Sequence, residues 1–116
     1  MQTQRWYDMA LSQTSGNLTV TTSELNLFAS QTTLQHYACW IFLNSMGASD
    51  VVEIKVYIND PQGTPAERLY FTAQYSGVQD DPAIFVPYVP TNSFRVTLKR
   101  IAGTITSADW ARLDLP

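Results

Sequence analysis

VVEIKVYIN, residues 51–59, is the stretch that decides the fold. Its side chains alternate strictly, with aliphatic residues at positions 52, 54, 56 and 58 and Glu53, Lys55 and Tyr57 between them. A period of two gathers the aliphatic residues on one face of a β-strand, whereas a helical period would scatter them. Val and Ile are β-branched and suit a pleated, half-buried surface. We therefore expect a strand with one face in the core.

Other segments read as partners for that face. They are residues 17–22, 24–29, 34–43, 67–76, 83–86, 93–101 and 105–115, separated by turn signals such as 60–65 and 76–82. About eight short strands with a turn every 8–12 residues are typical of an antiparallel sandwich or small barrel. The fold class is therefore all-β, a single antiparallel β-sandwich that is jelly-roll-like. An immunoglobulin-like sandwich is the alternative.

A length of 116 residues corresponds to one domain. Residues 17–116 form the sandwich domain in this interpretation. Residues 1–16 show no clean period before the turn signal Ser15-Gly16, so they are expected to be an N-terminal arm or an edge strand.

Three strands have features that bear on the surface. In residues 67–76 the alternation places Leu69, Phe71, Ala73 and Tyr75 inward and Arg68, Tyr70, Thr72 and Gln74 outward. The strand at 83–86 should end at Pro87, with 88–92 running along an edge because proline cannot donate to a ladder. The run LQHYACWIFL, residues 34–43, is apolar on both faces, so it is either central or covered on one face by another chain.

Composition excludes several function classes. The net charge is -3, and the seven Lys and Arg residues are scattered, so we expect no nucleic-acid binding. No apolar run approaches the length of about 18 residues that a membrane helix needs, so we expect no membrane association. Charged residues make up 15% of the chain against a typical share of about 25%. Such a weakly charged surface suits a protein that packs against copies or partners.

Residues that could carry chemistry are few. His36 is the single histidine and Cys39 the single cysteine, and Cys39 lies in an apolar run that predicts a buried, inert thiol. Asp80 and Asp81, with Asp50 or Asp60, could offer oxygen ligands to calcium, but the D-x-D-x-D-G spacing is absent. The ten acids are spread singly, which does not favour a paired-carboxylate hydrolase. We expect no enzyme activity, cofactor or metal.

Aromatic residues are the strongest remaining signal. Fourteen of the 116 residues are aromatic, and several fall on outward faces or in loops. Exposed Trp and Tyr serve both subunit interfaces and sugar-binding platforms. The residues expected at a protein interface are Arg5, Trp6, Tyr7, Tyr57, Tyr70 and Tyr88.

Residues 51–110 also carry a familiar order of strand and turn residues. It runs as Y-S-G-x-Q from Tyr75, P-x-x-x-x-P from Pro82, V-T-L from Val96 and A-G-T from Ala102. This order resembles small β-sandwich proteins encoded among the structural genes of tailed phages and related viruses. The resemblance implies a virion component of the head-decoration or fibre-base type and carries no catalytic residue across.

The function expected from the sequence is therefore non-enzymatic. The chain would be a viral structural or accessory protein that is made in the host cytoplasm and located in the virion. Its partners would be its own copies, the major capsid protein or another virion protein. The alternative is a carbohydrate-binding module that uses loop aromatics such as Tyr88 to bind a glycan.

Overall fold

The computed structural model describes residues 11–64 and 66–116, and these residues form eight strands and no helix. The strands are β1 (Ser12–Thr19), β2 (Leu25–Asn26), β3 (Gln35–Phe42), β4 (Val51–Asn59), β5 (Glu67–Ser76), β6 (Ala83–Thr91), β7 (Phe94–Ala102) and β8 (Ser107–Leu115). The described residues therefore include no helix long and apolar enough to span a membrane.

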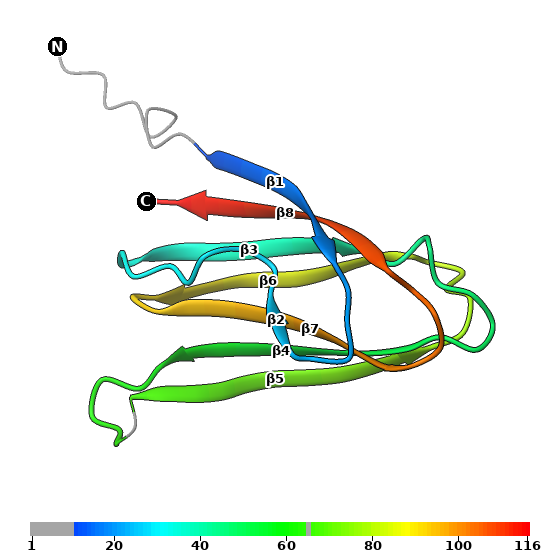
Figure 1. The fold of residues 1–116 in the computed structure, drawn as a ribbon. Coiled ribbons are helices and arrows are strands. Elements are labelled where there is room, and N and C mark those ends of the chain that lie inside the picture. The colour runs from blue at the N-terminus through cyan, green and yellow to red at the C-terminus, as the bar shows by residue number, and fades with distance from the viewer. Residues whose placement is uncertain (1–10, 65) are drawn as a thin grey trace, which may run out of the picture.

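Two four-stranded antiparallel sheets face each other (Figure 1). The first sheet, here called sheet A, has the order β1-β8-β3-β6, and the second, sheet B, has the order β2-β7-β4-β5. This is the strand order of an eight-stranded jelly roll, in which two Greek keys share one sandwich. The predicted all-β sandwich is confirmed. The immunoglobulin-like alternative is wrong, because that fold would place the first two strands in one sheet.

The opening stretch lies where its pattern predicts. β4 is an inner strand of sheet B, and Val52, Ile54 and Val56 are fully buried. Facing residues of β3 complete the core, with Tyr37, Cys39 and Ile41 also at 0% exposure. Burial of this kind supplies the main favourable free energy of folding, at roughly 25 cal/mol for each Å² of apolar surface removed from water.

Asp50 joins two loops at one end of the sandwich. Its Oδ2 accepts a hydrogen bond from the backbone N–H of Gly47, and its Oδ1 accepts bonds from the N–H groups of Thr104 and Ile105. Gly103 adopts the left-handed backbone conformation, with φ of 92°, directly against Asp50, where a Cβ atom would not fit. The loop before β4 and the turn before β8 are therefore fastened by one carboxylate.

The turn expected at Ser15-Gly16 is wrong, because both residues lie inside β1. Gly16 pairs with Trp110 of β8, and a Cβ atom at Gly16 would come within 2.8 Å of the indole ring. Glycine is present here because a ring occupies the space of a side chain, which is a recognised use of glycine within a strand.

The end expected at Pro87 is also wrong, since β6 continues to Thr91. β6 is an edge strand that pairs only with β3, and the pairing register shifts between Tyr37 and Cys39, so Pro87 and Tyr88 together oppose Ala38. A bulge on an edge strand is one of the places where a sheet accepts proline. The expectation that residues 88–92 run along an edge is confirmed.

A second bulge overturns part of the facing expected for residues 67–76. The β4–β5 register moves from Val56 opposite Phe71 to Tyr57 opposite Leu69, which leaves Tyr70 as an extra residue. Because one inserted residue reverses every side chain beyond it, Leu69 lies on the outer face with Tyr57 and is 50% exposed. Phe71 keeps its inward register but is 39% exposed, because β5 is the edge strand of sheet B.

Candidate protein-interaction surface

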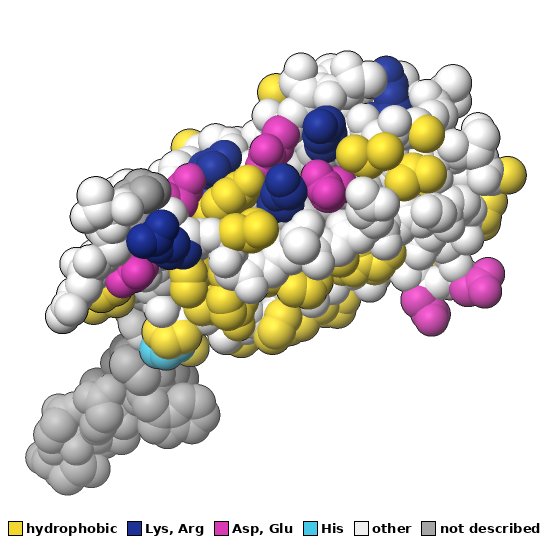
Figure 2. Space-filling view, turned by 90° about the horizontal axis from the view of Figure 1, so that it is seen from below, with side chains coloured by type: hydrophobic (Ala, Val, Ile, Leu, Met, Phe, Trp, Pro, Cys, Tyr) yellow, Lys and Arg dark blue, Asp and Glu magenta, His cyan; other side chains and the backbone are white. Residues whose placement is uncertain are grey.

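The outer faces of the two sheets differ in charge. The cross-strand pairing places Glu53, Lys55, Glu67, Arg95 and Lys99 on the outer face of sheet B. At the outward positions of the described strands of sheet A, His36 and Asp109 are the only residues among His, Asp, Glu, Lys and Arg. In Figure 2, most of the charged side chains in view gather on one side of the visible surface, and a hydrophobic band runs along the molecule beside them.

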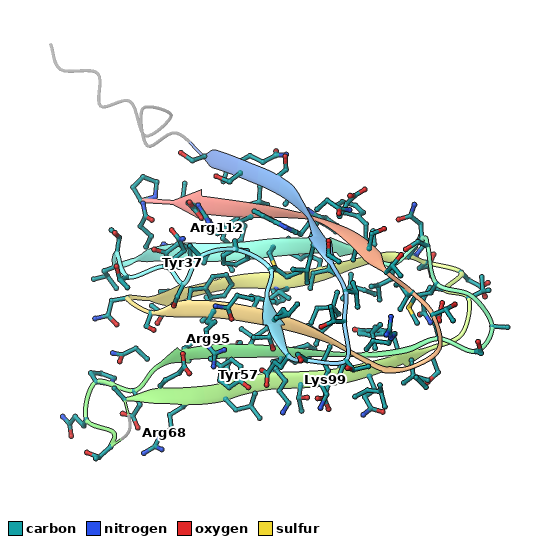
Figure 3. All side chains as sticks on the ribbon, in the orientation of Figure 1. Tyr37, Tyr57, Arg68, Arg95, Lys99 and Arg112 are labelled. Atoms are coloured by element: carbon teal, nitrogen blue, oxygen red, sulfur yellow. The ribbon has the colours of Figure 1, made fainter. Side chains whose placement is uncertain are left out.

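Several polar groups on the outer face of sheet B bond to one another. The Arg95 guanidinium donates to both carboxylate oxygens of Glu67, at 3.0 and 2.7 Å, and lies 4.0 Å from the centre of the Tyr57 ring. Figure 3 shows Tyr57 and Arg95 close together on this sheet. Tyr57 Oη donates to Glu24 at 2.7 Å, and Thr97 donates to the same carboxylate at 2.6 Å. Because these groups bond to one another, they form a solvated surface network and not a preformed ligand-binding site.

The pKa values in this network follow from the same contacts. Removal of the Tyr57 hydroxyl from water, and its bond to Glu24, raise the pKa of Tyr57 to about 12. Hydrogen bonds from Thr97 and then Tyr57 lower the pKa of Glu24, while the bond from Arg95 lowers the pKa of Glu67. Both carboxylates are therefore held ionised at neutral pH, as structural partners and not as proton donors.

The outer face of sheet A carries a cluster of aromatic rings. Trp40 on β3 packs against Phe85 on β6 with ring centroids 4.6 Å apart, and against Phe42 at 6.3 Å. Tyr88 meets Phe85 edge to face at 6.4 Å. Phe85 is 38% exposed and Tyr88 is 42% exposed. We call Trp40, Phe42, Phe85 and Tyr88 the aromatic face. Exposed contiguous apolar patches on a soluble domain mark interaction sites.

The aromatic face continues around the edge of the sandwich into a groove. This edge groove, about 300 Å³ in volume, lies between β5 and β6 and is lined by Tyr70, Phe71, Phe85, Val86 and Pro87. Every lining side chain is apolar or aromatic and none is charged. Phe85 belongs to both surfaces, so the aromatic face and the edge groove form one band.

A wider and shallower hollow lies on the same outer face of sheet A, toward β1. Its volume is about 740 Å³, and its wall combines the amides of Gln13, Asn17 and Asn44 with Asp109 and the ring of Phe42. Amide and carboxylate groups beside an aromatic ring offer directional hydrogen bonds and a stacking surface together.

The predicted interface residues are distributed unevenly over these features. Tyr70 lines the edge groove and Tyr88 belongs to the aromatic face, whereas Tyr57 is engaged in the sheet B network. Arg5, Trp6 and Tyr7 lie outside the described residues. An interface role for all six stays a prediction.

Sequence reasoning missed Trp40, Phe42, Phe71 and Phe85 as surface residues. The signal for two of them was present, because the run at 34–43 is apolar on both faces and its outward positions hold Trp40 and Phe42. Phe71 and Phe85 could not be found in this way, since their exposure depends on which strands end the two sheets.

The candidates for chemistry do not meet. His36 is exposed at the start of β3, and Cys39 is fully buried, which raises the pKa of its thiol to about 12. Asp80 and Asp81 are exposed, whereas Asp50 is bound to backbone N–H groups. Within residues 11–64 and 66–116, no three His, Cys, Asp or Glu side chains converge as a metal site would require.

Comparisons with known proteins show the fold alone. A protein of the Bacillus endospore appendages, a family of disulfide-linked pili, matches with a TM-score of 0.56 and 13% identity over 91% of this chain and 87% of the pilus protein. A protein named PirA matches with a TM-score of 0.50 and 8% identity over 88% of this chain and 92% of its own. A structure of the infectious bursal disease virus Gt strain reaches a TM-score of only 0.36, at 15% identity over 90% of this chain and 30% of the matched chain.

No protein-family model matches the sequence. No curated protein matches it either.

Proposed function

We propose that this chain is a non-enzymatic structural protein that assembles with its own copies, as a capsid-decoration or fibre-base component of a virion. The observation that carries the proposal is the difference between the two outer faces. One face carries five charged strand residues, while the other presents stacked aromatic rings, with neither Lys nor Arg at the outward positions of its described strands. A sandwich that stayed alone in water would be expected to place polar side chains on both outer faces.

Two further points support an assembly role. The residues that pack an interface core are Trp, Tyr and Phe with few charges, which is the composition of the aromatic face. The jelly roll is also a fold that capsid proteins use, although the fold by itself does not determine a function. The resemblance of residues 51–110 to phage structural proteins points in the same direction.

Solution mass by light scattering tests the proposal. The wild type should rise above its chain mass of 13.0 kDa as concentration increases toward about 1 mM, which corresponds to a contact of about 4 kcal/mol. The double variant Phe85→Ser/Tyr88→Ser should weaken self-association at least about tenfold, or about 1.4 kcal/mol. A wild type that stays monomeric over this range contradicts assembly with its own copies.

Ile101→Ser is the matched control. Ile101 is 42% exposed, the same as Tyr88, but it lies near the end of β7 in sheet B. Loss of an equally exposed apolar side chain at this position should leave the solution mass unchanged. If Ile101→Ser weakens association as strongly as the double variant, general surface hydrophobicity is responsible and the aromatic face is not the interface.

Carbohydrate binding is the second candidate, and the hollow beside β1 favours it. The amides of Gln13, Asn17 and Asn44 with the ring of Phe42 are groups that bind sugar hydroxyls and sugar faces. A glycan array probed with the wild type, Tyr88→Ala and Asn44→Ala separates the two functions. Glycan binding that either variant abolishes, in a chain that stays monomeric, supports this second function.

A further inference from the structure

We propose that the edge groove binds the Trp6–Tyr7 segment of a second copy of this chain. The inference rests on the proposed function, because it names the contact through which copies would assemble. Its starting point is the groove itself, an uncharged hollow between Tyr70 and Phe71 on one side and Phe85, Val86 and Pro87 on the other. The pairing register of Phe71 turns its side chain toward the inside of the sandwich, but the residue is still 39% exposed.

The strand beside the groove is open to pairing. β5 is ten residues long, pairs only with β4, and contains neither Pro nor Lys. Its other edge therefore presents free backbone N–H and C=O groups, which an extended peptide can bind as an added strand. β6, the other strand at this edge, has Pro87 and Pro90, which cannot donate to an added strand. Each of the two strands carries a bulge, but β5 has a regular register from Phe71 to Ser76. An added strand is thus expected at β5.

The first ten residues have the composition that this site requires. MQTQRWYDMA contains Trp6, Tyr7 and Met9, and its two charged side chains, Arg5 and Asp8, have opposite signs. In an extended segment, Trp6 points to one side and Tyr7 to the other, so either face offers an aromatic ring to the groove. A segment of zero net side-chain charge meets no repulsion from an uncharged groove.

For its backbone to pair with β5, the segment has to come from a second copy, because its own chain holds it too far away. Ser15, Ala111, Trp40 and Phe85 form one row across sheet A, so Phe85 lies three strand spacings, about 14 Å, from β1. Leu11 lies four residues, about 13 Å, along the strand from Ser15, which puts it about 19 Å from Phe85. Five residues from Leu11 to Trp6 span at most about 17 Å, and β5 lies a further sheet spacing away.

The two halves of this contact lie on opposite edges of the sandwich. The N-terminal segment joins β1 at one edge of sheet A, whereas the groove lies at β6 on the other edge. A contact between unlike surfaces is heterologous, and it generates rings or open filaments rather than closed dimers. A variant that lacks one half should therefore not assemble by itself, but its remaining half should still bind a copy that keeps the missing half.

Complementation between two full-length variants tests this. Trp6→Ser/Tyr7→Ser removes the donor and keeps the groove, while Tyr70→Glu puts a charge at the groove and keeps the donor. Each variant alone should remain at 13.0 kDa under conditions in which the wild type assembles. Their equimolar mixture should form a species of twice the chain mass and nothing larger, because one intact contact is left per pair. Thr72→Glu, on an exposed position of the same strand, should assemble like the wild type.

Other results would overturn the inference. Variants that assemble like the wild type would refute it while leaving assembly through another surface in place. A mixture that remains monomeric would also refute it. A wild type that never assembles would instead remove the proposed function itself. Circular dichroism checks that Tyr70→Glu is folded, and Pro87→Glu, which alters the groove from β6, serves as a second acceptor variant with the same expected result.

Discussion

At the scale of single residues, Asp50 has the most concentrated set of interactions. The residue is only 3% exposed. Its two carboxylate oxygens accept three backbone hydrogen bonds from two loops that are distant in sequence. The N–H of Gly47, then that of Thr104, lower the pKa of Asp50 below its ordinary value of 3.8. A backbone donor left without an acceptor in this position would be costly.

Stability should therefore depend on pH through this carboxylate. Because the folded state has the lower pKa, the stabilisation is fully present above the unfolded pKa of about 3.8 and is lost as pH falls through the folded pKa. Asp50→Asn should lower thermal stability at pH 7, since its NH₂ group faces an N–H donor, and the difference from wild type should shrink below pH 4. Thermal melts between pH 2 and pH 7 measure both effects.

Asp80→Asn is the control for that experiment. Asp80 is exposed in the loop before β6, so its substitution should leave the melting curve unchanged at every pH. If Asp80→Asn has an effect as large as Asp50→Asn, net charge and not the loop contact explains the pH dependence.

At the scale of elements, much of the strand pattern was predictable. The strict alternation of residues 51–59 predicts β4 and its buried face, because a period of two has no other regular explanation. Leu69 was assigned to the wrong face because the bulge at Tyr70 depends on pairing with β4, which alternation within β5 cannot reveal. Gly16 was wrongly predicted to lie in a turn for a similar reason. The strand requires glycine there because the indole ring of Trp110, from β8, occupies the space of a side chain.

Gly16→Ala should therefore weaken the β1–β8 pair. The new methyl group would come within 2.8 Å of the Trp110 ring, and overpacking of this kind costs about 1–3 kcal/mol. Hydrogen exchange should show faster exchange for the amides of β1 while β4 stays protected. Ser15→Ala, whose side chain lies on the opposite face, is the control and should leave exchange unchanged. Equal protection of β1 in Gly16→Ala would mean that the ring moves aside freely.

At the scale of the whole molecule, the two outer faces predict how assembly responds to salt. Raising NaCl from about 0.1 M to about 1 M shortens the Debye length from about 10 Å to about 3 Å, which weakens contacts between exposed charges. Association through the aromatic face should change less than about threefold over this range, and sodium sulfate should strengthen it. Light scattering across the series measures the response.

A large salt response would give a different picture of the interface. If association falls tenfold or more at high NaCl, the charged residues of sheet B, such as Lys99 and Glu53, would be the contact instead. The sequence predicted an interface rich in aromatic residues but not which sheet bears it, because outward positions of both sheets contain Tyr or Trp. Only the pairing of the strands separates Tyr57, in its network, from Tyr88 on the aromatic face.

The buried indole of Trp110 also makes the protein its own reporter. Within the described residues no acceptor reaches its Nε1, and the ring packs against Phe28 in the core. Its fluorescence should therefore be blue-shifted in the folded protein, and the loss of that shift records unfolding. Trp40 lies on the aromatic face and Trp6 in the N-terminal segment. Three variants that each keep a single tryptophan would thus report separately, by emission wavelength and quenching. Trp110 would report on the core, Trp40 on the aromatic face and Trp6 on the N-terminal segment.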